Sequence, residues 1–172
     1  MNESERSHPL VKLARESIAA RLSGKSPPVI DAGDNAGEPA GAFVSLKKSG
    51  QLRGCIGTIE PVRPDLVQEV ADNAIAAATR DPRFAPVTLE ELDDITISVD
   101  VLTRPEPVRS IDELDPEKYG VIVRSGHRKG VLLPDLPGIT TAEEQVRIAM
   151  QKAGIMESEH VELERFEVKR YY

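Results

Sequence analysis

The sequence has little cysteine, few aromatic residues and no long apolar segment. Its 172 residues include one Cys, three Phe, three Tyr and no Trp. One cysteine excludes an internal disulfide framework and a metal site built from several cysteines, and it fits a reducing compartment. Because aromatic side chains are so scarce, the core has to consist mainly of Val, Ile, Leu and Ala.

Net positive charge and membrane-length hydrophobic segments are also missing. The formal net charge is -7 and the pI is about 5.1, so the chain lacks the cations that neutralise phosphates. Few aromatics are available to stack on bases, and nucleic-acid binding is therefore disfavoured. The apolar runs span only a few residues, and the polar start of the chain lacks the apolar segment of a secretory signal. We expect a cytoplasmic protein that does not bind membranes.

The residues are 40% hydrophobic and 30% charged. This composition and length are typical of one globular domain with a hydrophobic core, or of two small lobes. The patterns of apolar residues predict an α+β fold with a largely antiparallel sheet flanked by helices. Ser7 is expected to cap the first helix, and residues 23–41 are expected to form a loop. A bulge is expected at residues 164–165 in the last strand. Helices are predicted at 9–22, 64–79 and from the capping boxes of 140–144 to 153, a helical turn at 89–93, and strands at 42–48, 52–59, 95–101, 119–124, 130–133 and 162–170.

The stretch Leu52–Thr58, with the sequence LRGCIGT, is the most informative feature. It places the only cysteine, Cys55, in mid-strand between Gly54 and Gly57. Glycine weakens a strand because it packs no side chain and costs backbone entropy, so something must approach the backbone closely there. Either the glycines permit a bulge or close packing within the sheet, or they leave backbone open to a ligand.

Cys55 has two interpretations. In the first, its thiol is a nucleophile or forms a transient adduct, and the cations Arg53, Arg80 and Arg83 favour the thiolate. In the second, Cys55 is a small apolar side chain that fills the core, since free cysteine is among the most buried residue types. A pairing of Cys55 with Arg83 would unite the two most distinctive segments of the chain.

The segment after the second helix also has two interpretations. Arg80 in the last helical turn stabilises the helix dipole, and Asp81 before Pro82 is an ordinary turn residue. Alternatively, Arg80 and Arg83 anchor a carboxylate or phosphate of a bound molecule.

The histidines predict no metal site. His8, His127 and His160 do not share an element at ligand spacing, and no nucleophile elbow is present for a Ser-His-Asp triad. The sequence identifies no cofactor.

Taken together, these segments resemble the AMMECR-one domain family in its bacterial and archaeal form, which is similar to protein A of the AmmeMemoRadiSam system. The resemblance covers residues 9–171, which makes 1–8 an N-terminal tail and 9–172 the domain. One departure is visible, because Ala85 precedes a single Pro86 where the family usually has two prolines. The resemblance rests on LRGCIGT at 52–58, Gly41–Val44, Arg80–Phe84, the strand at 95–102, Leu132–Pro134 and Phe166–Val168.

The resemblance implies an α+β protein of two unequal lobes, whose boundary the sequence does not place, with the hallmark segment near the groove between them. It also implies one pathway shared with Memo-type and radical S-adenosylmethionine proteins. Two functions remain open: a Cys55-dependent enzyme acting on an anionic substrate, or an adaptor that binds a partner protein or peptide, for which a sheet edge is one possible place. The residues expected to bind the ligand around Cys55 are Arg53, Gly54, Gly57, Thr58, Arg80, Asp81 and Arg83.

Overall fold

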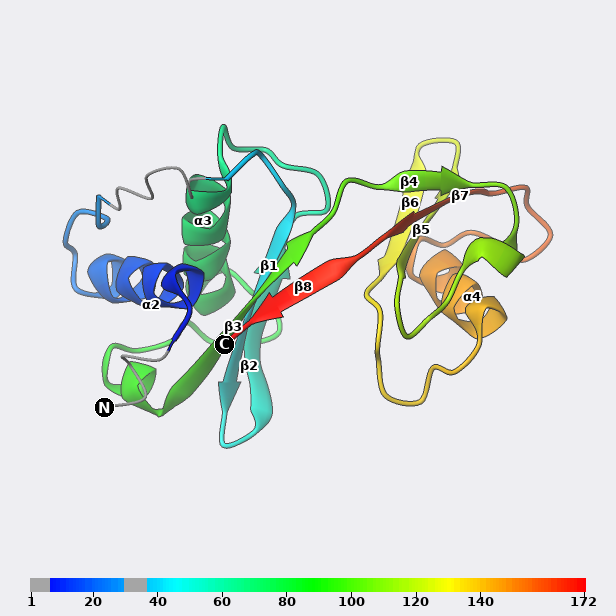
Figure 1. Ribbon diagram of the computed structural model, residues 1–172. Coiled ribbons are helices and arrows are strands. Elements are labelled where there is room, and N and C mark those ends of the chain that lie inside the picture. The colour runs from blue at the N-terminus through cyan, green and yellow to red at the C-terminus, as the bar shows by residue number, and fades with distance from the viewer. Residues whose placement is uncertain (1–6, 30–36) are drawn as a thin grey trace. The chain divides into compact units, whose positions relative to one another are not determined.

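The structure is a computed structural model that describes residues 7–29 and 37–172 (Figure 1). Within these residues three helices and two four-stranded antiparallel sheets confirm the predicted α+β class. The chain divides into two compact units. Unit 1 comprises the residues up to Leu102 together with Lys169–Tyr172, and unit 2 comprises Thr103–Val168. Residues 1–6 of the predicted tail and 30–36 of the predicted loop lie outside the described residues.

The sheet of unit 1 has the strand order β2-β1-β3-β8. Its strands are β1 (Ala42–Lys48), β2 (Gln51–Gly57), β3 (Ile95–Leu102) and β8 (Val168–Tyr171). The predicted hairpin of β1 and β2 closes through Ser49 and Gly50, which both have positive φ, at 51° and 77°. Two consecutive positive φ values suit the right-handed twist of a two-residue hairpin turn. The register then shifts so that Arg53 is an extra residue, which leaves β2 as a bulged edge strand.

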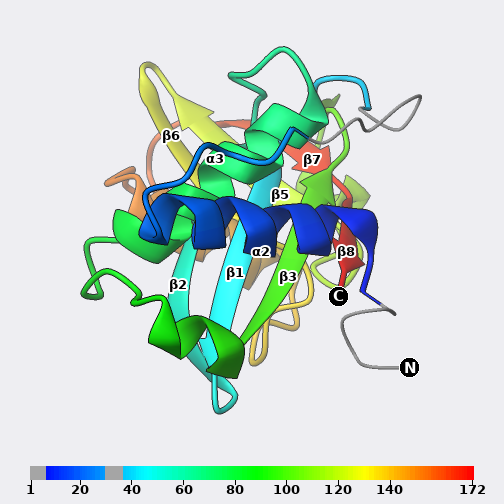
Figure 2. The same cartoon turned by 90° about the vertical axis from the view of Figure 1, so that its left-hand side faces the viewer.

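Two helices cover one face of this sheet, as Figure 2 shows. Helix α2 spans Pro9–Leu22 as predicted, but the expected cap was wrong. The imidazole of His8, not Ser7, accepts the Leu10 N–H, because Pro9 is already the first helical residue. Helix α3 spans Leu66–Thr79 and begins after Asp65, whose carboxylate caps the Gln68 N–H.

The core of unit 1 lies between these helices and the sheet. The alternating residues of β1 and β3 that face the helices are almost fully buried, and they are Ala42, Val44, Leu46, Ile95, Ile97 and Val99. The 3-10 helix η2 (Glu90–Asp94), predicted as a helical turn at 89–93, leads directly into β3. Within the described residues of unit 1, no helix packs on the opposite face of the sheet, which carries mostly polar side chains together with Phe43.

Gly54 allows α3 to approach β2 closely. A Cβ atom at Gly54 would lie 2.2 Å from the Ala77 carbonyl oxygen. Helix α3 is rich in alanine where it contacts the sheet, with Ala74, Ala77 and Ala78 buried. The glycine and the alanines together permit backbone-to-backbone packing that a larger residue would block.

Unit 2 is built from a second sheet, one α-helix and the short 3-10 helix η3 (Ile111–Glu113). Its core contains Val121, Val123, Ala149 and Met150. The predicted hairpin forms as β5 (Gly120–Ser125) and β6 (Arg128–Leu132), and helix α4 (Ala142–Lys152) packs against both. Thr141 caps α4 by accepting the Glu144 N–H. The sheet order is β4-β7-β5-β6. Strand β4 (Glu106–Val108) was not predicted, because an edge strand of three residues that contains Pro107 has no recognisable strand pattern in the sequence.

The predicted last strand was wrong in one respect. Residues 162–170 do not form one strand with a bulge, because β7 (Glu162–Phe166) belongs to the second sheet and β8 to the first. The parity change in the sequence marks a passage between sheets at Glu167. The Thr103 N–H donates to the Glu167 carbonyl. This hydrogen bond joins the segment that follows β3 to the segment that precedes β8.

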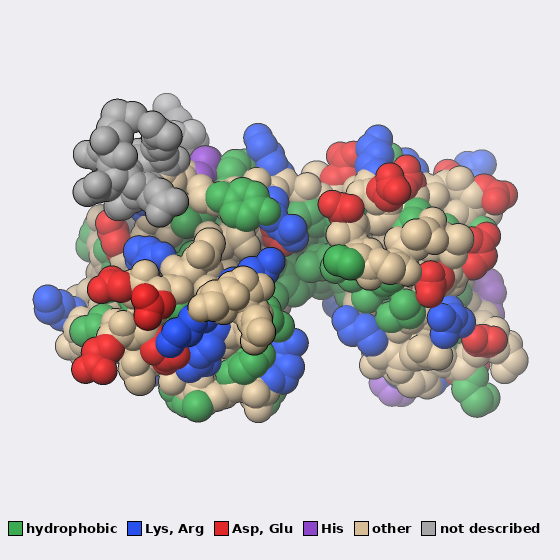
Figure 3. Space-filling view, turned by 90° about the horizontal axis from the view of Figure 1, so that it is seen from below, with side chains coloured by type: hydrophobic (Ala, Val, Ile, Leu, Met, Phe, Trp, Pro, Cys, Tyr) green, Lys and Arg blue, Asp and Glu red, His purple; other side chains and the backbone are tan. Residues whose placement is uncertain are grey.

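The surface gives no sign of an extended patch of one charge on the face drawn in Figure 3, where basic and acidic side chains are interspersed. Over residues 7–29 and 37–172, none of the helices combines the length and the apolar character that crossing a bilayer requires.

Replacing Gly54 with Ala should destabilise the protein by about 3 kcal/mol, at the upper end of the usual range for overpacking, because its Cβ would collide with backbone and not with a movable side chain. Gly24→Ala is the matched control, since Gly24 has positive φ but nothing within 4 Å of the added Cβ. The control should cost only about 1–2 kcal/mol. Urea denaturation measures both, and equal losses would contradict the close helix–strand contact.

Candidate functional site

The Cys55 side chain lies on the helix-free face of the unit 1 sheet and is half-buried. Its Sγ lies 3.2 Å from the Ser45 Oγ on β1. Ser45 is in turn paired in register with Ser98 on β3. Three small polar side chains, Ser98, Ser45 and Cys55, therefore form a row across three adjacent strands, and the thiol is at the end of the row on the edge strand.

The backbone of Cys55 is clamped by the segment that follows α3. The Cys55 N–H donates to Asp81 Oδ2 at 2.9 Å, and Arg83 Nη2 donates to the Cys55 carbonyl at 3.4 Å. Arg83 also donates through Nε and Nη2 to the two carboxylate oxygens of Asp81, at 3.0 Å and 2.7 Å. The structure thus joins Cys55 to Arg83, but through the backbone of Cys55. The pair satisfies edge-strand groups that would otherwise be open to pairing.

Charge around the thiol is balanced, not strongly positive. Asp81 is only 5% exposed. The hydrogen bonds from Arg83, together with those from the backbone N–H groups of Cys55 and Arg83, hold the pKa of Asp81 far below its usual range despite burial. The same carboxylate raises the pKa of Arg83, and the electrostatic effect of Cys55 raises it further. The guanidinium contacts the Cys55 backbone, and Asp81 offsets much of its charge.

The other two predicted arginines do not converge on the thiol. Arg53 Nη2 binds the Glu91 carboxylate at 3.1 Å, and Arg53 Nη1 donates to the Ala85 carbonyl. The hydrogen bonds from Arg53, followed by those from the Thr88 N–H and from Lys48, lower the pKa of Glu91 to about 2. Arg80 ends α3 as its C-cap, and its side chain is exposed. Arg53 consequently ties the bulge of β2 to the start of η2.

Gly57 and Thr58 have packing partners of their own. A Cβ atom on Gly57 would lie 2.2 Å from the ring of Phe43, the residue opposite it on β1. The Thr58 hydroxyl donates to Glu69 Oε1 at 2.6 Å, and Asn73 donates to the same hydroxyl. In this structure the space beside each of the two hallmark glycines is filled by protein.

Glu69 was not singled out from the sequence. It is 1% exposed, and its carboxylate accepts the Thr58 hydroxyl and the N–H groups of Val62 and Arg63. Its position in the first turn of α3 resembles an ordinary dipole-stabilising acid, so only the fold reveals that it holds the loop after β2.

A small polar pocket adjoins the Cys55 row on the helix-free face. Its volume is about 80 Å³, and its lining residues are Ser45, Lys47, Thr96, Ser98, Arg170 and Tyr172. Arg170 is held by Asp100 on β3, through Nε to Oδ1 at 2.6 Å and Nη2 to Oδ2 at 2.8 Å. Asp100 is 1% exposed, although the alternation of β3 predicted the wetter face for it.

These pocket residues escaped sequence reasoning because no motif carries them. A strand in which serine, threonine and lysine alternate with apolar residues is typical of a sheet with one ordinary solvent-exposed face. In the described part of the chain, no three His, Cys, Asp or Glu side chains are grouped so that they could hold a metal ion.

Replacing Asp81 with Asn should destabilise unit 1 by about 2 kcal/mol at neutral pH, because charge-assisted hydrogen bonds to Arg83 and Cys55 are weakened. Folding lowers the pKa of Asp81 from 3.8, so its stabilisation is present above that value and disappears as pH falls toward the folded pKa. Urea denaturation at about pH 7 and about pH 3 should show a smaller gap between the wild type and the variant at the lower pH.

The control for this measurement is Glu16→Gln on the exposed side of α2. It should leave stability nearly unchanged at both pH values. A gap for Asp81→Asn that is the same at both pH values would show that the charge of the carboxylate contributes nothing.

Comparisons with known proteins identify the family. The family model described as AMMECR1 matches residues 11–171. A protein of Thermotoga maritima is 63% identical over 134 residues, which are 77% of this chain and 77% of that protein. A Clostridium acetobutylicum protein is 47% identical across 99% of this chain, which corresponds to only 37% of that longer protein. The crystal structure of an uncharacterised protein from Pyrococcus horikoshii aligns with a TM-score of 0.82 at 34% identity, covering 94% of this chain and 88% of that one. The chain belongs to the AMMECR1 family.

Proposed function

We propose that unit 1 binds a small anionic ligand on the helix-free face of its sheet and acts on it through the Cys55 thiol. One observation carries the proposal. Ser45 lines the polar pocket and also lies 3.2 Å from the Cys55 sulfur. A ligand group in the pocket is therefore separated from the thiol by a single side chain.

The lining of the pocket favours an anion. Lys47 contributes positive charge, Arg170 contributes charge that its ion pair with Asp100 offsets in part, and the other lining residues contribute hydroxyl groups, while none of the described lining residues is Asp or Glu. Because water occupies about 30 Å³ per molecule in the liquid, a volume of about 80 Å³ accommodates one carboxylate or phosphate group. The rest of a ligand would lie along the sheet face toward Cys55.

The thiol is suited to reversible addition to a carbonyl group. In that step the sulfur–carbon bond forms, and the thiol proton passes to the carbonyl oxygen, so no further reactant is required. Among the described residues, Ser45 is the side chain that hydrogen-bonds Sγ, and its hydroxyl can relay the proton. The Asp81–Arg83 clamp on the Cys55 backbone fixes the nucleophile before the ligand arrives, which lowers the entropic cost of addition.

Family resemblance supports a place for this chemistry in one pathway with Memo-type and radical S-adenosylmethionine proteins. The proposal is that the thiol holds an electrophilic, anionic intermediate of that pathway. The single cysteine fits a reducing compartment, so the proposed place of action is the cytoplasm.

The proposed function first predicts that the Cys55 thiol is accessible to reagents. Iodoacetamide should alkylate the folded protein once, at a rate within about tenfold of the rate in urea, because a half-buried thiol is reachable. Mass spectrometry counts the adduct without ambiguity, since Cys55 is the only cysteine and Cys55→Ser provides a blank. A folded protein that resists alkylation at about pH 8 would end the thiol proposal.

The proposed function also predicts that the polar pocket binds anions. Glyoxylate, an anionic aldehyde, should protect Cys55 from iodoacetamide more strongly than acetate, which binds as an anion but cannot form the adduct. Lys47→Met should weaken protection by glyoxylate roughly fivefold, because one exposed charge contributes up to about 1 kcal/mol. Lys25→Met, a change of the same charge at an exposed position outside the pocket, should leave protection unaltered. Equal effects of the two lysine variants would refute the pocket as the anion site.

A further inference from the structure

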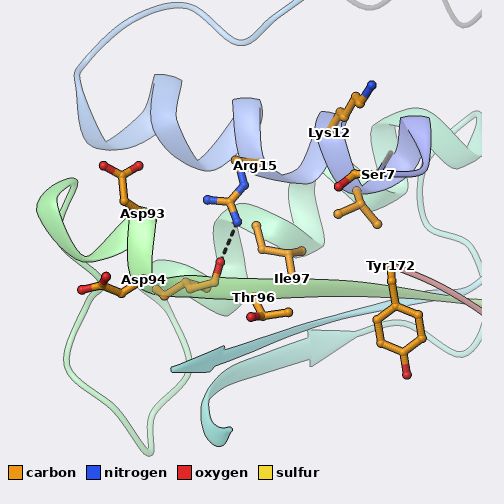
Figure 4. A pocket seen from close by; sticks show the side chains of 10 residues that line it. Ser7, Lys12, Arg15, Asp93, Asp94, Thr96, Ile97 and Tyr172 are labelled. Atoms are coloured by element: carbon orange, nitrogen blue, oxygen red, sulfur yellow. Dashed lines mark hydrogen bonds between the residues drawn. The ribbon is translucent and has the colours of Figure 1, made fainter. Parts of the chain in front are cut away.

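A cleft in the described part of unit 1 is lined by residues other than Cys55. It has a volume of about 650 Å³ and lies between α2, η2 and the edge of β3 (Figure 4). Figure 4 shows Asp93 and Asp94 at one end, Tyr172 at the other, and Arg15 reaching down from α2 between them. We propose that this cleft binds an extended peptide, which adds to the edge of β3 and places a basic residue against Asp93 and Asp94.

The edge of β3 is covered over only part of its length. On one side, β1 pairs with β3 from Ile95 to Val101. On the other side, the ion pair of Asp100 with Arg170 places the short strand β8 against the C-terminal half of β3. The N-terminal half, Ile95–Ile97, lines the cleft instead. A sheet edge of this kind is the feature that extended peptides use in β-strand addition.

The backbone of Ile97 supplies the pairing groups. Along β3 the N–H and C=O groups turn alternately to the two sides, and the Leu102 N–H goes to Gly41 on the β1 side. By this alternation the N–H and C=O of Ile97 turn to the cleft side. Ile95 is already engaged, because its N–H donates to Leu92 and its carbonyl accepts Arg15 Nη2 at 2.6 Å. A peptide is therefore expected to pair with β3 at Ile97.

The acidic end of the cleft selects the kind of peptide and its direction. Of the two cations that line the cleft, Arg15 donates to the Leu92 and Ile95 carbonyls, and Lys12 lies away from Asp93 and Asp94 (Figure 4). Asp93 and Asp94 are exposed, and their carboxylates make no ion pair or hydrogen bond with residues 7–29 or 37–172. A peptide in line with β8 runs antiparallel to β3, so its C-terminal end reaches η2. Lysine or arginine at that end complements the two carboxylates, whereas an acidic residue there would be repelled.

The test uses two fluorescein-labelled peptides of the same composition. Each alternates threonine and valine, and two lysines stand at the C-terminal end of one and at the N-terminal end of the other. Fluorescence anisotropy should show saturable, micromolar binding of the first and at least about fivefold weaker binding of the second. N-methylation of the central valine should abolish binding, because it removes a backbone donor. Equal binding of the two peptides, or full binding of the N-methylated form, would overturn the proposal.

A pair of protein variants locates the binding in the cleft. Asp93→Asn combined with Asp94→Asn should weaken binding of the first peptide roughly fivefold, in line with two exposed ion pairs. The control combines Glu16→Gln with Glu90→Gln, which makes the same charge change at exposed residues outside the cleft. All four side chains are exposed, so folding should be preserved. Cys55→Ser should bind the peptide like the wild type, which separates this site from the thiol site. A loss of binding in the control equal to that in the Asp93 and Asp94 variant would exclude the cleft.

Discussion

The buried carboxylate of Asp81 is the interaction on which the arrangement around Cys55 depends. A β-strand at a sheet edge has backbone groups without a neighbour, and β2 is such a strand. Asp81 supplies an acceptor for the Cys55 N–H, and Arg83 supplies a donor for its carbonyl. The same two side chains neutralise one another. A short segment with two charges thus replaces a fifth strand, and the thiol keeps a fixed position without a partner strand beside it.

Close approach of helix to sheet is the second constraint, and it explains much of the hallmark segment in structural terms. Gly54 gives room to the carbonyl of Ala77, and Gly57 gives room to the ring of Phe43. Thr58 joins the network of the buried Glu69, which orders the loop that follows. Gly54 and the Glu69 network hold β2 against α3 on one face, whereas Gly57 packs against Phe43 on the helix-free face. On that face lie Cys55, Ser45 and the polar pocket, to which the proposed function is assigned.

The two candidate sites of unit 1 lie on different parts of one sheet. The polar pocket is on the helix-free face and adjoins the thiol, whereas the larger cleft follows the open edge of β3 beneath α2. They share Thr96 and Tyr172 as lining residues. A molecule that carried both an anionic group and an extended peptide could therefore contact both, because β3 connects them directly.

The sequence by itself determined most of the helices and strands and the buried faces of the regular ones, because residue periodicity and turn preferences are local. The helix at Pro9–Leu22, the turn at Ser49–Gly50 and the alternation of β3 all follow from neighbouring residues. It also indicated Cys55 and the segment of Asp81 and Arg83 as distinctive. Only the tertiary structure decided that Arg83 reaches the Cys55 backbone, that Asp100 is buried beneath Arg170, and that residues 162–171 divide between two sheets. These contacts join residues far apart in the chain, and the free energy of a buried charge or an edge strand depends on partners that no local pattern specifies.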